Sequence, residues 1–367
     1  RDYLLNTVRF WTEQFDIDGL RLDAADVLDF DFMRSLRALA EEIKEDFWLM
    51  GEVIHGEYSR WVNGETLHSV TDYALHKGLY SGHNDHNYFE IAHTVRRTLG
   101  MVPAHIRLYN FVDNHDVERI MTKLTTKAHY LPVHVLLYTL PGIPSVYYGS
   151  EFGIEGKKER FSDDSLRPAI DLDDHADDYE ENPCTQLIAA LGAMRTSWAA
   201  DLAWGDYREL ALTTEQYAFG RGRLIVAVNN ADAEASVEVP AEAEAYVGVL
   251  GGERVEASGG RLRIELAACG AEVYAPEGAA GTDAEGTAIQ EAFAKLQAEA
   301  REEQVADAHL EEVEVPAVPL DEMTVEQLQA TILSKMAANG PVTDQMRRDV
   351  TQNVWKDSLV NWARSFR

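Results

Sequence analysis

The chain has 367 residues, 46% of them hydrophobic, and its 33 basic and 63 acidic side chains give a formal net charge of −30. The length exceeds the roughly 250–300 residues at which a single core stops growing, so we expect more than one domain. The apolar content excludes intrinsic disorder, and the acidic charge disfavours nucleic acid and anionic membranes as partners, since their phosphates would be repelled.

The chain begins Arg1-Asp2-Tyr3-Leu4, with no initiating methionine and no signal-like apolar segment. We therefore expect it to be the C-terminal part of a longer protein. No stretch approaches the roughly 18 apolar residues that a membrane span requires. The two cysteines, Cys184 and Cys269, are far apart and lack a metal-ligand pattern, which indicates a reduced, cytoplasmic setting.

Residues 1–200 alternate helical and strand patterns. Apolar side chains at helical spacing predict helices over 3–15, 32–43, 87–99 and 128–140, and short β-rich runs predict strands at 17–22, 47–51, 68–71, 108–112 and 145–148. The connections are too long for hairpins, which indicates parallel strands joined by right-handed crossovers. An open doubly wound sheet and part of a (β/α)8 barrel both fit this pattern, and both bind ligands at the C-terminal ends of their strands.

The sequence pattern changes after residue 200. Short strands with Gly and Asn-Asn breaks predict an antiparallel β-domain over 201–276, and residues 277–322 form an acidic helix and linker. A helical hairpin over 323–367 begins with a capping box at Thr324 and Gln327, stops at Gly340-Pro341 and resumes at Thr343. Its aromatic stripe is expected to pack on the upstream part or on another subunit, so a homo-oligomer is compatible with the sequence.

Three predicted strand ends each carry one carboxylate: Asp23, Glu52 and Asp116. Because parallel strands deliver their ends to one rim, these acids are expected to lie together, as ligands of a divalent metal or as acid-base groups. Arg21, on the same strand face as Asp23, would hold that carboxylate ionised and weighs against a metal. Glu52 follows the apolar run 47–51, which would keep it protonated, and glycosidic cleavage requires this pairing of one charged and one protonated acid.

Four ordered segments carry a family resemblance: DGLRLD at 18–23, FWLMGEV at 47–53, VDNHD at 112–116 and GIPSVYYGSE at 142–151. They resemble motifs of the α-amylase superfamily, glycoside hydrolase family 13, and most of all its cyclomaltodextrinase, neopullulanase and maltodextrin glucosidase group. The resemblance implies that 1–200 is the C-terminal part of a (β/α)8 TIM barrel, strands 4 to 8, followed by a β-sandwich over 201–276. It does not extend to the helical tail.

The resemblance implies a retaining glycosidase that cleaves α-1,4 bonds of maltodextrins, cyclodextrins or starch-derived oligosaccharides. Asp23 would be the nucleophile, oriented by Arg21, and Glu52 the general acid and then the base. Asp116 and His115 would bind the sugar at the cleaved bond. The carboxyls of a retaining pair lie about 5–5.5 Å apart.

Other positions carry weaker expectations. Arg167 resembles an arginine that contacts the next sugar outward, and Asn114 is expected to shape its loop. Several aromatic rings lie near predicted strand ends or loops where a sugar could stack, although core packing is the ordinary role of each: Trp48, Tyr73, Tyr80, Tyr88, Tyr109 and Tyr147. We predict no metal site: the histidines 55, 83 and 86 fit no ligand spacing and are expected to form hydrogen bonds or to be exposed. No cofactor is required, and a structural calcium is compatible with the resemblance.

The sequence also departs from the family pattern. Asp26 and Val27 stand where many α-amylases have a Lys-His pair, which favours small maltodextrins, and the segment 53–55 lacks a tryptophan found in several neopullulanase-type enzymes. The family's first motif and three barrel strands are expected upstream, so the isolated chain should be poorly folded and inactive. A transferase or isomerase of the same superfamily, a non-catalytic amylase-like module and a metal-dependent enzyme stay open as alternatives, as does the choice between cyclic and linear substrates.

Overall fold

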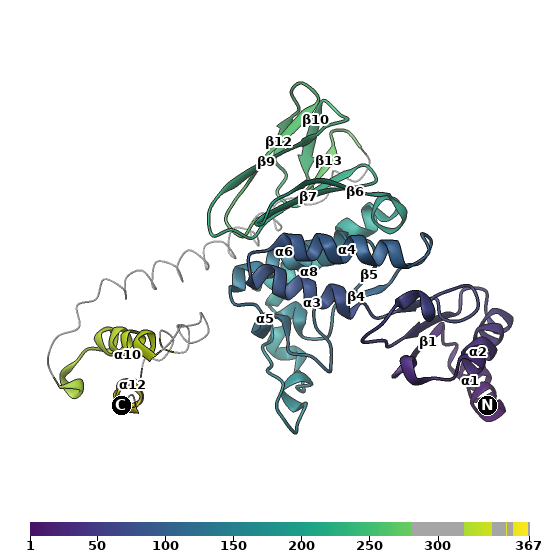
Figure 1. The fold of residues 1–367 in the computed structure, drawn as a ribbon, viewed down its shortest axis with the longest axis horizontal. Coiled ribbons are helices and arrows are strands. Elements are labelled where there is room, and N and C mark those ends of the chain that lie inside the picture. Colours follow the sequence, from purple (N-terminus) through teal and green to yellow (C-terminus); the bar gives the residue numbers. More distant parts are fainter. Residues whose placement is uncertain (280–318, 340–349, 351–354, 366–367) are drawn as a thin grey trace. The chain divides into compact units, whose positions relative to one another are not determined.

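The computed structural model describes residues 1–279, 319–339, 350 and 355–365. The chain divides into two compact units, of which the first contains residues 1–124 and 129–293 and the second residues 125–128 and 294–367 (Figure 1). Most of the predicted acidic linker over 277–322 lies outside the described residues.

Five short parallel strands form the centre of the first part of the chain. They are β1 (Gly19–Leu22), β2 (Trp48–Gly51), β3 (Ser69–Val70), β4 (Tyr109–Phe111) and β5 (Ile143–Ser145). β1, β2 and β3 pair in sequence order, β4 pairs with β5, and an isolated parallel bridge between Thr71 and Tyr109 connects the two groups. The predicted parallel arrangement in chain order is therefore confirmed.

The fifth strand differs from its prediction at 145–148. The residues that pair with β4 are Ile143–Ser145, and the aromatic pair Tyr147-Tyr148 lies beyond the strand. The chain turns at Gly149, whose φ of 85° is a conformation that glycine adopts without steric cost. Aromatic residues favour strands in general, but here backbone pairing with β4 places the strand two residues earlier.

Helices precede, connect and follow these strands. They are α1 (Asp2–Phe15), α2 (Phe30–Ile43), α3 (Tyr73–Asn84), α4 (Tyr88–Met101), α5 (Ile120–Lys123), α6 (Tyr130–Thr139), α7 (Asp178–Glu181) and α8 (Pro183–Ser197). Single turns of 3-10 helix lie at 25–27, 58–60, 127–129, 150–152, 164–166 and 172–175, and a π-helical turn lies at 200–204. Side-chain caps begin several helices: Asp29 accepts from the Phe32 N–H and Asp72 from the Leu75 N–H.

The helix α3 was not predicted, and its glycines explain why. Gly78 and Gly82 lower the helix propensity of this segment, so its sequence indicates a helix only weakly. In the structure Gly82 faces α4, where a Cβ would lie 2.8 Å from a side-chain carbon of Ile91. The glycine therefore allows α3 and α4 to pack closely, which the sequence pattern alone does not reveal.

Apolar faces of α1 and α2 cover β1 and β2. Met33, Leu36 and Leu39 of α2 are buried in one cluster with Leu49 of β2. The helical spacing of the three α2 residues places them on one side of the helix, and each fully buried side chain of this size contributes about 1.5–3 kcal/mol through removal from water. This packing holds α2 against β2.

A β-rich region follows. Its strands are β6 (Tyr207–Leu212), β7 (Gln216–Arg221), β8 (Leu224–Asn229), β9 (Ala235–Pro240), β10 (Ala245–Gly248), β11 (Arg254–Glu256), β12 (Arg261–Leu266) and β13 (Ala271–Pro276). Six form an antiparallel sheet in the order β11-β10-β13-β8-β7-β6, and β12 pairs with β9. Alternate residues of β12, including Leu262 and Ile264, share a core with Ala218 and Ile225 of the larger sheet. Only the short strand β11 was not predicted.

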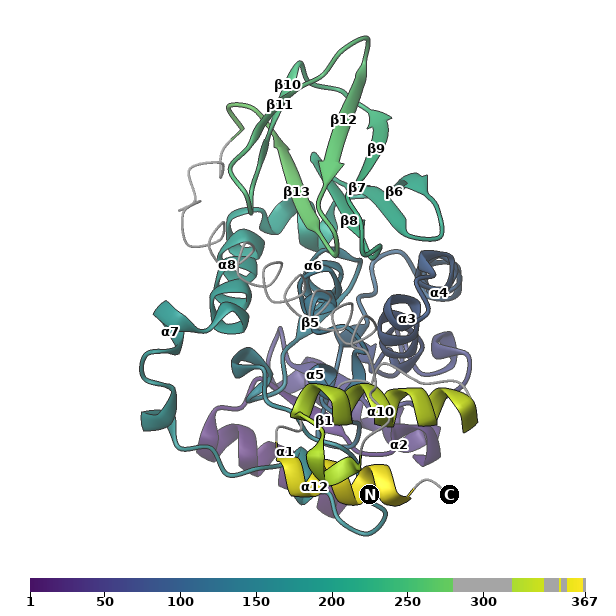
Figure 2. The same cartoon turned by 90° about the vertical axis from the view of Figure 1, so that its left-hand side faces the viewer.

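The β-rich region contacts the helices of the parallel part. Both β8 and β13 contact α6, and Figure 2 shows these strands on one side of α4, α6 and α8. Arg221 of β7 is buried and donates to the carbonyl oxygen of Thr139, at the end of α6. The helix α6 is buried along its whole length, because it is covered from several sides.

The second unit contains the helices α10 (Val325–Asn339) and α12 (Lys356–Ser365), preceded by a 3-10 turn at 320–322. They share an apolar cluster that includes Leu328, Ile332 and Leu359. The predicted capping box is present: the Thr324 hydroxyl accepts from the Gln327 N–H at 3.2 Å, and the Gln327 side chain accepts from the Thr324 N–H at 2.9 Å. The predicted second-helix start at Thr343 lies outside the described residues.

Within the described ranges, no helix is long and apolar enough to cross a membrane. Cys184 and Cys269 are both buried free thiols.

Candidate active site

Asp23 and Glu52 directly follow two neighbouring strands, next to residues that are paired with each other. Leu22 of β1 is paired with Gly51 of β2, and each acid is the next residue of its chain. Backbone hydrogen bonds continue the pairing beyond the strands: the Glu52 N–H donates to Leu22 at 2.8 Å, and the Ala25 N–H donates to the Glu52 carbonyl oxygen at 2.8 Å. Because paired strands lie about 4.8 Å apart, the two acids start from adjacent backbone positions.

The backbone immediately after Asp23 is strained. Ala24 has φ 46° and ψ 50°, a left-handed conformation that a residue with a Cβ rarely adopts and that costs on the order of 1 kcal/mol. This sharp turn brings the next N–H, that of Ala25, to the Glu52 carbonyl oxygen. This hydrogen bond ties the segment after Asp23 to the segment that carries Glu52.

Arg21 pairs with Glu52, contrary to the prediction that it pairs with Asp23. A guanidinium nitrogen of Arg21 lies 3.0 Å from Glu52 Oε2. Glu52 is buried, with 7% of its surface exposed, whereas Asp23 is exposed and, among the described residues, receives neither a hydrogen bond nor an ion pair. A buried carboxylate has lost its hydration and needs a partner more than a hydrated one does, which explains the choice.

Glu52 also has a second polar partner. The prediction that the apolar run 47–51 gives Glu52 apolar surroundings is therefore wrong. The Tyr73 hydroxyl donates to Glu52 Oε1 at 3.2 Å. Tyr73 opens α3 directly after β3, so it reaches the site from the third strand end of the same rim. Burial raises the pKa of Tyr73, so its hydroxyl stays a donor at neutral pH.

Asn114 connects this pair to the loop that carries Asp116. The Asn114 amide donates to the Tyr73 hydroxyl at 3.2 Å, and its side-chain oxygen accepts from the Asp116 N–H at 2.8 Å and from the Val117 N–H at 3.2 Å. The prediction that Asn114 shapes its loop is confirmed. We call Arg21, Glu52, Tyr73, Asn114 and Asp116 the strand-end network.

Asp116 is contacted by three basic side chains. Arg167 lies 3.0 Å from Asp116 Oδ1 and His115 Nε2 lies 3.0 Å from Oδ2, while Lys158 donates to the Asp116 carbonyl oxygen at 2.8 Å. Arg167 also donates to the His115 carbonyl oxygen at 3.1 Å. The structure thus brings the three predicted residues Asp116, His115 and Arg167 together at one place on the surface, with side chains that are 33–45% exposed.

Two more acidic or basic groups near the site have other roles. Asp113, at the end of β4, is buried and accepts from the Ser150 hydroxyl and the Ile120 N–H. All its bonds join segments of the fold, which indicates a structural role. Lys158 was missed by sequence reasoning, since it lies in a loop with no pattern that would relate it to Asp116.

Two of the histidines considered for a metal behave as predicted. His83 is buried and bonds through one nitrogen to Leu79 and through the other to the Tyr88 hydroxyl, and His55 is exposed. Tyr73 is one of six aromatic residues that the sequence offered for stacking on a sugar, and the structure places its hydroxyl on Glu52.

Residues 1–187 match a family model described as "Alpha amylase, catalytic domain". The chain is 28% identical over 288 residues to a cyclomaltodextrinase of Geobacillus thermopakistaniensis (strain MAS1), an alignment that covers 75% of this chain and 47% of the relative. It is 29% identical over 287 residues to neopullulanase 2 of Thermoactinomyces vulgaris, covering 72% and 46%. The chain thus spans about half or less of the length of the curated relatives it matches.

Solved structures share the fold. An α-amylase of Anoxybacillus superposes with a TM-score of 0.62 at 24% identity, covering 76% of this chain and 63% of the other. An α-amylase of Malbranchea cinnamomea gives a TM-score of 0.65 at 22% identity, covering 75% and 60%. Likeness at this identity establishes a (β/α)8 barrel-type fold with a β-rich region.

Proposed function

The chain belongs to the α-amylase catalytic-domain family, and from this premise we propose that the protein containing it is a retaining α-glycoside hydrolase. Its substrates are the α-1,4 bonds of maltodextrins, cyclodextrins and starch-derived oligosaccharides. The observation that carries the proposal is the position of Asp23 and Glu52 at the ends of paired parallel strands. Two carboxylates on neighbouring strand ends can reach one glycosidic linkage from opposite sides.

In the proposed reaction, an Asp23 oxygen attacks the anomeric carbon while the bond from that carbon to the leaving sugar's oxygen breaks. Glu52 gives its proton to that oxygen, which leaves a covalent glycosyl ester on Asp23. Glu52 then takes a proton from water, whose oxygen attacks the same carbon and releases Asp23. Two displacements at one carbon retain its configuration.

We assign Arg21 a position that changes during the reaction. In the structure its guanidinium lies on Glu52. Asp23 is only two residues away along the strand, so we propose that Arg21 moves to Asp23 when a sugar covers the site. There it would hold the nucleophile charged.

Asp116 and His115 are proposed to bind the sugar at the cleaved bond. Asp116 is partly exposed and a basic side chain lies at each of its carboxylate oxygens, so the carboxylate lies where it can accept hydrogen bonds from sugar hydroxyls. Arg167 is engaged by Asp116, and we therefore propose it as a positioning residue for that carboxylate rather than as a contact of the next sugar.

A glucan transferase is the second candidate. The chain is 24% identical over 238 residues to a cyclomaltodextrin glucanotransferase of Geobacillus stearothermophilus. A transferase resolves the same ester with a sugar hydroxyl instead of water, so the strand-end network serves both reactions. A non-catalytic module is disfavoured because Asp23, Glu52 and Asp116 are all present.

Proton NMR of the intact protein acting on maltotriose tests the proposal. The first product released should have the α configuration at the new reducing end, and glucose and maltose should be the products. A first-formed β anomer would contradict a retaining mechanism. Oligosaccharides longer than maltotriose would instead show transfer. The variant Asp23→Asn is the control for activity from a contaminating enzyme.

Further features are proposed on weaker support. The five parallel strands correspond to strands 4 to 8 of the barrel, and β6–β13 to a C-terminal β-sandwich. The reaction needs no organic cofactor, because side chains and water supply every group. Buried free thiols, together with 31% identity over 164 residues to an intracellular maltogenic amylase of Bacillus subtilis, support a cytoplasmic setting. The helical tail is proposed to mediate self-association.

A further inference from the structure

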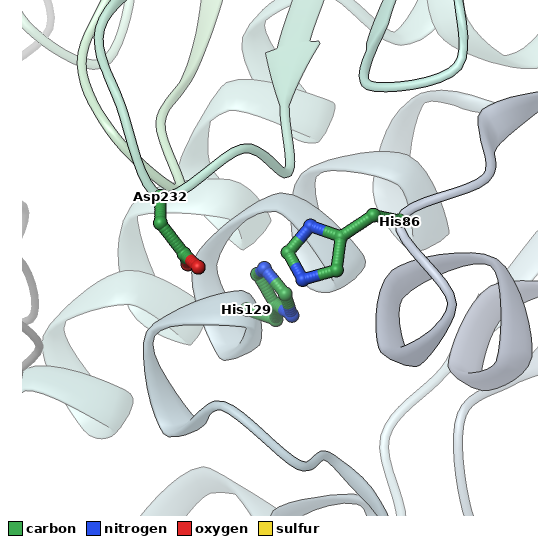
Figure 3. Close-up of side chains that lie close together, drawn as sticks. All are labelled: His86, His129 and Asp232. Carbon is green, nitrogen blue, oxygen red and sulfur yellow. The ribbon is translucent and has the colours of Figure 1, made fainter.

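Three potential metal ligands meet where the helices contact the β-rich region. His86 lies in the loop between α3 and α4, His129 directly precedes α6, and Asp232 lies in the turn between β8 and β9. One ligand atom from each lies within 4.8 Å of the others. Figure 3 shows the carboxylate and the two imidazole rings gathered around one small space. We call these three residues the histidine cluster.

His129 has a free lone pair in the interior. Its side chain is fully buried, and its Nε2 lies 3.1 Å from the carbonyl oxygen of Asn230. Because a carbonyl oxygen can only accept, Nε2 carries the proton, and the Nδ1 lone pair is left buried without a partner among the described atoms. Metal-binding histidines commonly donate their other ring N–H to a backbone carbonyl in this way.

His83 is close by, but both of its nitrogens have partners, so it is not a candidate ligand.

His86 is held toward the cluster by an unusual backbone. It has φ 46°, which a histidine adopts at a cost, and the N–H of the next residue, Asn87, donates to Gly82 at 2.7 Å. Its Nδ1 is buried and has no hydrogen-bond partner. A buried polar atom without a partner destabilises the fold, so two such nitrogens in one cluster need an explanation.

Asp232 gives the cluster a negative charge and an opening to solvent. It is exposed, whereas His129 is buried, so an ion could enter from the side of the β8–β9 turn. The turn is fixed from both sides: the Ala231 N–H donates to Asn229, and Ala231 accepts from the Cys269 N–H. The carboxylate therefore has a defined place beside the two rings.

We propose that His86, His129 and Asp232 bind a divalent transition-metal ion, with Zn²⁺ as the best match. Calcium and magnesium prefer oxygen ligands, whereas two imidazoles and one carboxylate suit zinc, with water in the fourth position. Donor atoms on tetrahedral zinc lie about 3.3 Å apart, so binding requires small side-chain rotations. The ion ties the α3–α4 loop and the start of α6 to the β-rich region. None of its ligands belongs to the strand-end network.

Calorimetric titration of the intact protein, freed of metal with a chelator, tests the site. We expect one Zn²⁺ per chain and a Zn²⁺-dependent rise in the melting temperature, with little effect of Ca²⁺. His86→Gln and Asp232→Asn should each weaken Zn²⁺ affinity by more than the roughly 10–100-fold that loss of a supporting residue causes. His93→Gln removes an exposed histidine of α4 and should leave the affinity unchanged.

These Zn²⁺-binding measurements test the metal site independently of glycosidase activity. Absence of saturable Zn²⁺ binding, unchanged affinity in both Asp232→Asn and His86→Gln, or an equal loss in His93→Gln would each overturn it. Tight Ca²⁺ binding that Zn²⁺ cannot replace would also contradict it. Asp232 is exposed, so its replacement leaves the fold intact even if changes at the buried His129 do not.

Discussion

The strand-end network and the histidine cluster handle ionisable side chains in opposite ways. In the network and beside it, charged groups pair with each other, as the buried Glu52 does with the partly exposed Arg21, and Asp116 with Arg167. In the cluster, the imidazole of His129 is buried and donates to a backbone carbonyl. The first arrangement suits chemistry that moves protons and charge, and the second suits a resident ion that stabilises the fold.

The largest expected effect is the loss of kcat when either proposed catalytic acid is replaced. In the intact protein, Asp23→Asn should reduce kcat by at least about 10⁴-fold because it removes the nucleophile, and Glu52→Gln should reduce it by roughly 10²–10⁴-fold because it removes the acid and base. Steady-state kinetics on maltotriose measure both.

Two controls accompany these variants. Asp26→Asn changes an exposed acid three residues after Asp23, and Asp232→Asn changes the cluster, and both should keep activity within a few-fold of wild type. A large loss in Asp232→Asn with an unchanged melting temperature would break the division between catalytic and stabilising regions.

Asp72 combines properties of both regions, since it follows a strand but is buried. Burial raises its pKa from 3.8 to about 6. Between these values the unfolded chain has lost the proton that the folded protein keeps, so the contribution of Asp72 to stability is complete below pH 3.8 and is lost as the pH rises through 6. Relative to Asp72→Asn, the free energy of unfolding should fall by about 3 kcal/mol over this range.

Urea titrations at several pH values compare the two proteins. Asn is an equally good helix cap, so Asp72→Asn keeps the bond from the Leu75 N–H while removing the titration. Asp29→Asn is the matched control, because Asp29 caps α2 in the same way but is exposed. Equal pH dependence in wild type and Asp72→Asn would contradict the assignment.

Asp116→Asn tests the exposed part of the site. We expect kcat/KM to fall about 10²-fold, because a charged acceptor for sugar hydroxyls is lost. The stability should change by less than about 1 kcal/mol, since partly exposed ion pairs contribute little. Asp163→Asn removes the other carboxylate that Arg167 contacts and should leave kcat/KM nearly unchanged. A similar loss in both variants would show that the charge around Arg167 matters, not sugar binding by Asp116.

Tyr73→Phe should have the smallest effect. It removes the hydroxyl between Glu52 and Asn114, a loss of about 1 kcal/mol or roughly fivefold in kcat/KM. Tyr109→Phe removes a hydroxyl that bonds to Ser145 instead and should change kcat/KM by less than twofold. Identical kinetics in the two variants would remove Tyr73 from the network.

The sequence predicts what depends on local pattern and chain order. The acids at 23, 52 and 116 could be identified because each follows a β-rich run, and parallel strands place such residues on one rim. The capping box at Thr324 and Gln327 is likewise a local signal, and the structure has both of its hydrogen bonds.

Side-chain choices and distant contacts could not be predicted. Arg21 lies near both Asp23 and Glu52, and its pairing with Glu52 follows from burial, which only the folded structure reveals. The histidine cluster brings together three segments far apart in the chain, so no spacing rule finds it. The same holds for Lys158, which reaches Asp116 from a loop without a recognisable pattern.

Trapping the covalent intermediate tests the central claim most directly. A maltosyl fluoride with a second fluorine on its ring forms the ester quickly, because fluoride leaves readily, and releases it slowly, because the electron-withdrawing fluorine destabilises the oxocarbenium-like transition state. After incubation with the intact protein, mass spectrometry of proteolytic fragments should find one fluorosugar on Asp23 and none in Asp23→Asn. A label on Glu52 or Asp116, or turnover without any labelled protein, would contradict the account.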